Sequence, residues 1–151
     1  MNLQNSLPAY LTQLLYDLEG IEEPLPYHPE ENALVHSLQV FEIALNTHNN
    51  HILIGAALLH DIGKVQAIEG HAALGAHLLE GLLPDHLVWL VEHHMDLVYV
   101  ARRTERIYRN TQLLSELKLL RKWDLQGRRA NARVCSVEFA VDFICSRLRV
   151  R

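Results

Sequence analysis

Apolar residues recur at intervals of three and four along most of the chain, which is the spacing of one face of an α-helix. No segment shows the strict alternation that predicts a half-buried strand. Ser6 is placed to cap the first helix, and Gly20 to end it. The pattern therefore predicts an all-α protein, a bundle of about seven helices. The expected helices cover residues 7–18, 34–45, 52–59, 74–82, 87–94 and 113–120, and a C-terminal helix covers 133–149.

The composition is that of a single folded domain. The chain has 151 residues, of which 49% are hydrophobic and 21% charged, so it is long enough to bury a core and is neither fibrous nor disordered. We expect one domain over residues 1–151. It contains no apolar run near the ~18 residues of a membrane span, no signal peptide and only two cysteines. These features predict a cytoplasmic protein without a membrane partner, and they leave its oligomeric state open.

Charge is distributed unevenly along the chain. Residues 1–101 hold 13 acidic side chains and one base, Lys64, whereas residues 102–151 hold 5 acidic and 13 basic side chains. All 10 histidines lie between His28 and His94. The acidic part therefore holds every imidazole, and the basic part holds almost every fixed positive charge.

Four polar residues stand where the helical period points into the core. His36 lies on the second helix, His60 and Asp61 end the most apolar helix, and Asp124 follows Leu120 by four residues. A core histidine or a helix-end aspartate is usually a hydrogen-bonding group when it stands alone. An ionised carboxylate buried without a partner costs several kcal/mol, however, and Lys64 is the only base before Arg102. A divalent cation held by two imidazoles and two carboxylates would satisfy all four groups.

This pattern resembles the HD superfamily of metal-dependent phosphohydrolases, and most closely the HD domain of bacterial CCA-adding tRNA nucleotidyltransferases. The resemblance spans residues 27–128, with the helix 133–149 beyond it. It implies an HD-domain helical bundle around a metal site, with hydrolysis of phosphate esters as the usual activity. Nothing in the chain resembles the glycine-rich catalytic motif of a nucleotidyltransferase, so we do not expect CCA addition. The strings that carry the resemblance are Tyr27-His28-Pro29-Glu30, His36, Leu59-His60-Asp61-Ile62-Gly63-Lys64, Gly70-His71, Gly75-Ala76 and Asp124-Leu125-Gln126-Gly127-Arg128.

Other HD proteins carry a second metal on additional histidines. By helical phase, His71 and His94 face the core, in preference to His77 and His93. They are candidates either for a second metal or for support of a single one. The expected cofactor is thus one or two divalent ions of Mn, Mg, Ni, Co or Fe. No comparable argument makes His48, His51 or His86 a metal ligand.

The expected mechanism is attack of a metal-activated water on phosphorus. Asp61 would ligate the metal and orient the water, and Lys64 would stabilise charge on the phosphate. Arg128 is a further candidate for binding the substrate, together with its neighbour Arg129. His28, in the proline-rich segment before the second helix, is a candidate for the mouth of the site.

The sequence thus predicts hydrolysis of a phosphomonoester or phosphodiester of a nucleotide or an RNA end. Two alternatives stay open. One is a dinuclear hydrolase of dinucleoside polyphosphates, and the other is a non-catalytic, metal-stabilised module that binds RNA or a protein. The run 102–109 holds four arginines and a tyrosine. It is either an RNA-binding segment or a solvated helix face.

Overall fold

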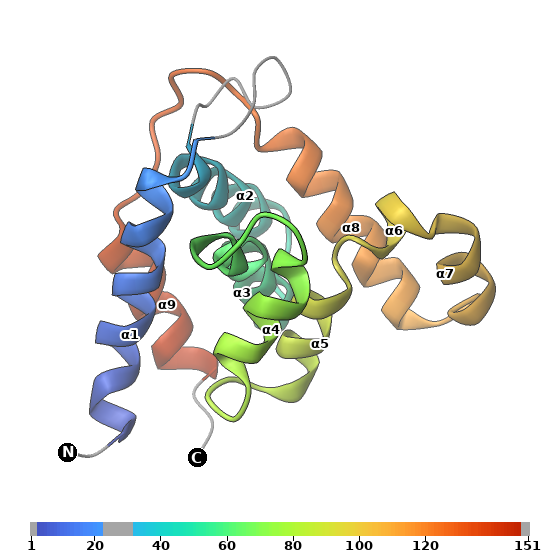
Figure 1. Cartoon of the computed structure of the whole chain (residues 1–151), viewed down its shortest axis with the longest axis horizontal. Coiled ribbons are helices and arrows are strands. Elements are labelled where there is room, and N and C mark those ends of the chain that lie inside the picture. Colours follow the sequence, from blue (N-terminus) through green and yellow to red (C-terminus); the bar gives the residue numbers. More distant parts are fainter. Residues whose placement is uncertain (1–2, 23–31, 149–151) are drawn as a thin grey trace.

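A computed structural model describes residues 3–22 and 32–148, with side chains from residue 6 onward. The described chain is all-α, and its one β-type contact is an isolated bridge between Glu22 and Asn32. The seven expected helices are present, and two short helices, α6 and α7, accompany them (Figure 1). The elements are α1 (Leu3–Asp17), η1 (Leu18–Gly20), α2 (Ala33–Thr47), α3 (His51–Leu59), η2 (Ile62–Val65), α4 (His71–Leu79), α5 (Asp85–His93), α6 (Asp96–Tyr99), α7 (Ala101–Ile107), α8 (Gln112–Gln126) and α9 (Val137–Leu148).

Side-chain caps set the starts of α2, α3 and α8. The Asn32 side chain accepts a hydrogen bond from the Val35 amide at 2.9 Å at the start of α2. Asn50 accepts from the Ile52 and Leu53 amides at the start of α3, and Thr111 accepts from the Leu114 amide at the start of α8. Such caps satisfy donors that the first turn of a helix leaves free.

Two helix starts differ from those expected. The first helix begins at Leu3, so Ser6 lies inside it and not at its cap. The last helix begins at Val137 and not at residue 133, because the Ser136 hydroxyl accepts from the Phe139 amide at 3.1 Å and caps it there. Residue 149 lies outside the described part of the chain, as do His28 and the Tyr27–Glu30 string.

Helix α3 is the centre of the bundle. Every residue from Leu53 to Leu59 is buried, as the uncharged segment predicted, and the helix packs against α2, α5, α8 and α9. A side chain at Gly55 would lie 2.6 Å from Leu87 Cδ1 and 2.8 Å from Leu148 Cδ1, so glycine allows α5 and α9 to approach. The central position of α3 places His60 and Asp61, at its end, deep inside the protein.

A close backbone approach joins η2 to the start of α4. A Cβ atom on Gly63 would lie 1.8 Å from the His71 carbonyl oxygen and 2.6 Å from the Gly75 nitrogen. Only glycine fits this contact, which holds Asp61 beside His71. None of the helices in the described ranges is long and apolar enough to cross a bilayer.

Candidate metal centre

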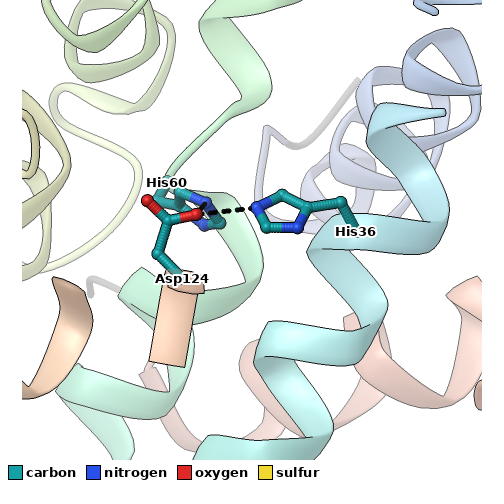
Figure 2. A group of neighbouring side chains, drawn as sticks. All are labelled: His36, His60 and Asp124. Carbon is teal, nitrogen blue, oxygen red and sulfur yellow. Dashed lines mark hydrogen bonds and ion pairs between the residues drawn. The ribbon is translucent and has the colours of Figure 1, made fainter. Parts of the chain in front are cut away.

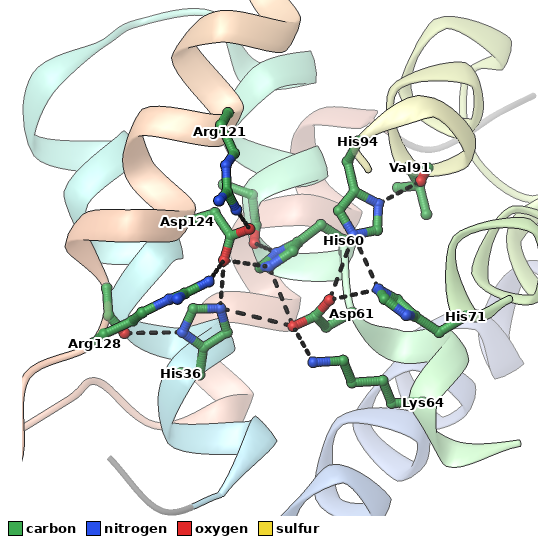
Figure 3. A network of polar contacts seen from close by, with 12 residues as sticks. His36, His60, Asp61, Lys64, His71, Val91, His94, Arg121, Asp124 and Arg128 are labelled. Atoms are coloured by element: carbon green, nitrogen blue, oxygen red, sulfur yellow. Dashed lines mark hydrogen bonds and ion pairs between the residues drawn. The ribbon is translucent and has the colours of Figure 1, made fainter. Parts of the chain in front are cut away.

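Six polar side chains meet in the middle of the bundle, where Figure 3 shows them pointing toward one another. All six are buried, and His36 and His60 have no exposed surface. They come from α2, the turn after α3, the start of α4, the end of α5 and the last turns of α8. They are His36, His60, Asp61, His71, His94 and Asp124.

Each of the four imidazoles is fixed by the same kind of hydrogen bond. Its Nδ1 lies within 2.9 Å of a backbone carbonyl oxygen, and a carbonyl can only accept, so Nδ1 carries a proton. In the neutral ring, Nε2 then carries a lone pair that points into the centre. Metal-ligating histidines are held in the same way, with Nδ1 donating a hydrogen bond and Nε2 free to bind the metal. The pairs are His36 with Gly127 at 2.9 Å, His60 with Ala57 at 2.8 Å, His71 with Ile68 at 2.9 Å and His94 with Val91 at 2.6 Å.

His36, His60 and Asp124 form the first group able to hold a cation (Figure 2). Asp124 Oδ1 lies 2.9 Å from His36 Nε2 and 3.6 Å from His60 Nε2. The His60 Nε2 atom is buried and has no hydrogen-bond partner. A lone pair this close to a carboxylate oxygen requires a proton or a metal ion between them.

Asp61, His71 and His94 form the second group. The two Nε2 atoms lie 3.2 Å apart, and Asp61 Oδ1 lies 3.1 Å from the first and 3.5 Å from the second. Because both rings donate through Nδ1, two lone pairs and a carboxylate oxygen face one another. This donor set fits a cation.

Asp61 lies between the two groups. Its Oδ1 faces His71 and His94, while its Oδ2 lies 3.3 Å from His60 Nε2 and 3.7 Å from His36 Nε2. One carboxylate thus presents one oxygen to each group. Asp61 could therefore help to hold an ion in either group.

The charges of the centre shift several pKa values. Burial works to lower the pKa of His60, but the nearby carboxylates of Asp61 and Asp124 raise it to about 10. Burial likewise works to raise the pKa of both carboxyls, but the neighbouring imidazoles hold each pKa well below its ordinary value. Burial lowers the pKa of His94. Without a metal, the centre therefore holds a proton on His60 between two carboxylates.

Three cationic side chains surround the carboxylates (Figure 3). Lys64 Nζ lies 3.1 Å from Asp61 Oδ2, and an Arg128 terminal nitrogen lies 3.7 Å from Asp124 Oδ1. The Arg128 Nε atom is buried without a hydrogen-bond partner. Arg121 donates to Asp124 Oδ2 at 3.3 Å, and sequence reasoning missed it. Its position one helical turn before Asp124 was the available signal.

The other candidates lie elsewhere. The Arg129 backbone bonds to Gln39, and Arg129 lines a separate pocket beside α2. His77 is exposed beside Glu80, and His93 stacks on Trp89 and contacts Asp96 at 2.7 Å. His48 and His51 lie against aromatic rings, and His86 lies 3.1 Å from the buried Glu116. The preference for His71 and His94 over His77 and His93 therefore agrees with their placement.

Comparison with protein families decides the class of the domain. The HD domain model matches residues 33–125, which include all six side chains of the centre. The chain belongs to the HD domain family. HD domains bind divalent metals and form a superfamily of metal-dependent phosphohydrolases. The two groups of histidine and aspartate described above supply side chains able to hold such a metal.

The chain also resembles part of a curated protein. It is 43% identical over 49 residues to the "Multifunctional CCA protein" of Nitrosococcus oceani. The aligned part covers 32% of this chain but only 12% of the relative. This is consistent with an HD domain close to those of CCA-adding enzymes.

Proposed function

We propose that this HD domain is a phosphohydrolase that cleaves a phosphate ester of a nucleotide or an RNA end, with two divalent ions as cofactors. The observation that carries the proposal is the convergence of four Nε2 lone pairs and two carboxylates on one buried centre. His36, His60, Asp124 and Asp61 Oδ2 would hold one ion, and Asp61 Oδ1, His71 and His94 the other. Imidazole-rich donor sets favour Mn, Fe, Co or Ni over Mg.

A bound ion supplies a water of lowered pKa and polarises a phosphoryl oxygen. Asp61, fixed by contacts on both oxygens, would help to hold the ion and could accept a hydrogen bond from the attacking water. Lys64 Nζ is held within 3.1 Å of the same carboxylate, where it can donate to a phosphate oxygen as charge develops. The buried Arg128 Nε offers a second donor. As the new P–O bond forms, the ester P–O bond breaks, and the leaving alkoxide takes up the proton that the attacking water loses.

Hydrolysis of a dinucleoside polyphosphate is a second candidate. Two ion-holding groups and three cationic side chains gather much positive charge around two carboxylates. A polyphosphate chain would compensate that charge better than a single phosphomonoester does. The two candidates share the metal centre and differ only in the substrate.

Elemental analysis combined with a substrate panel tests the proposal. Protein purified with added Mn should carry about two metal equivalents and hydrolyse a member of a panel of phosphorylated nucleosides, oligonucleotides and dinucleoside polyphosphates. Asp61→Ala should lose both metals and all turnover. His77→Ala, which removes an exposed imidazole, is the matched control. Turnover that persists in Asp61→Ala contradicts the proposal, and metal binding with no turnover on any substrate favours the non-catalytic module.

A further inference from the structure

Helices α6 and α7 form an arm at the edge of the molecule, far from α1 and α9 (Figure 1). We define the arm as residues 96–109. On α7 the only buried residue is Thr104, so the helix contributes little to the core. Yet the arm exposes four large apolar side chains, among them Tyr99 at 75% and Ile107 at 54%. A segment that stabilises the fold so little and exposes so much apolar surface is suited to contact a partner.

The arm is also strongly basic. Arg102, Arg103, Arg106 and Arg109 are all exposed, and no acidic side chain in the described part of the chain pairs with any of them. Among the described residues, α7 forms one ion pair, between Glu105 and Lys118 at 3.7 Å. All four bases are arginine, whose planar guanidinium pairs with phosphate and stacks on bases.

A groove of about 370 Å³ separates the arm from α4 and α5. Its lining combines the ring of Tyr108 and the aliphatic Val100 and Ile107 with charged side chains of both signs, Arg103, Glu92 and Asp96. Tyr108 is held edge-on against the Trp89 ring at 5.4 Å between ring centroids. An aromatic ring beside polar groups suits a nucleobase, which stacks on the ring and hydrogen-bonds at its edge.

The arm borders the proposed metal centre along the chain. Helix α6 begins two residues after His94, and it packs against α8, which carries Asp124. A polymer lying along the arm would therefore have one end near the centre.

We propose that the arm and its groove bind single-stranded nucleic acid, with the arginines on its phosphates and a base in the groove. Positive charge alone would also suit an acidic protein or an anionic membrane. The groove with its aromatic ring and the adjacent metal centre favour a polynucleotide. The kinetic part of the test below rests on the proposed function, and the binding part does not.

Fluorescence anisotropy with labelled 12-nucleotide oligouridylate and oligothymidylate, measured on the full chain in EDTA, tests binding without turnover. Arg102→Gln/Arg106→Gln should reduce the slope of log affinity against log salt by about 1.4, since each single-strand phosphate contact contributes about 0.7. Tyr108→Ala, which removes the ring from the groove, should weaken binding by roughly fivefold or more. Lys122→Gln/Arg147→Gln removes the same charge elsewhere and should leave the slope unchanged.

Several results overturn the proposal. They are no binding at 50 mM salt, equal losses in the control variant, or equal binding of a duplex of the same length. Equal binding of polyglutamate or of vesicles containing phosphatidylserine also overturns it. The two oligonucleotides distinguish RNA from DNA.

A kinetic comparison separates this proposal from the proposed function. Arg102→Gln/Arg106→Gln should raise KM for a 3′-phosphorylated oligonucleotide but not for a nucleoside 3′-monophosphate. Loss of both activities in a folded variant contradicts the arm proposal. Absence of turnover in the wild-type protein contradicts the proposed function, while the binding result still decides the arm.

Discussion

Metal binding should displace a proton from His60. Without metal, Asp61 and Asp124 raise the pKa of this imidazole to about 10. At pH 7 about one molecule in a thousand then has His60 deprotonated at Nε2. Removing this proton costs about 4 kcal/mol, and the cost is subtracted from the free energy of metal binding. We therefore expect the apparent affinity for the first ion to rise about tenfold per pH unit between pH 7 and 8.5.

Isothermal titration calorimetry on EDTA-treated protein measures this linkage. Titrations of Mn²⁺ at pH 7.5 in two buffers of different ionisation enthalpy give the number of protons released, and we expect about one for the first ion. His77→Gln, an exposed imidazole, should release the same number. Tight binding that releases no proton and does not change with pH would refute the reasoning, because it would mean that His60 is already neutral.

Three further predictions concern the fold and the second group. Gly63→Ala should destabilise the protein by about 3 kcal/mol in urea unfolding, because its Cβ meets backbone atoms at 1.8 and 2.6 Å; Gly20→Ala, with nothing within 4 Å, is the control. His71→Ala should lower the metal content from two equivalents to one by elemental analysis, and retention of both would contradict the second group. In metal-free protein, His60 stabilises the fold fully below pH 6.5, and this is lost as pH rises through about 10. Asp61 stabilises it above pH 3.8, and this is lost as pH falls below that value. Melting temperatures measured from pH 3 to 10 should therefore be highest between about pH 3.8 and pH 6.5, where both contributions are present. A melting temperature that does not change with pH would contradict both pKa shifts.

The residues of the centre could be predicted because each occupies an apolar phase of a helix. His36 and Asp124 continue buried stripes, and His94 shares the face of Leu90 and Val91. Helical phase also separated His94 from His93, which lies against Trp89 in the structure. Helical phase does not give the distance between helices, so it could not show that Asp61 lies between two groups able to hold an ion.

The features that the sequence did not predict have different causes. Arg121 looks like an ordinary solvent-facing residue of α8 until its bond to Asp124 is seen. The short helix α7 has one buried residue and therefore no apolar stripe to detect. The late start of α9 follows an extended stretch in which the Cys135 amide donates to Glu42, 93 residues away, at 2.5 Å. No local pattern encodes such a bond.

The contact between His36 and Asp124 joins positions 88 residues apart in the chain. An ion that ligates both would act as a reversible cross-link that closes a loop of that length. By the chain-entropy relation for cross-links, such a closure is worth about 4.5 kcal/mol through its effect on the unfolded state. Loss of metal would then lower resistance to proteolysis and heat as well as activity. Substitutions at the centre should therefore be compared at matched metal occupancy, because a drop in cellular abundance could otherwise be mistaken for a loss of catalysis.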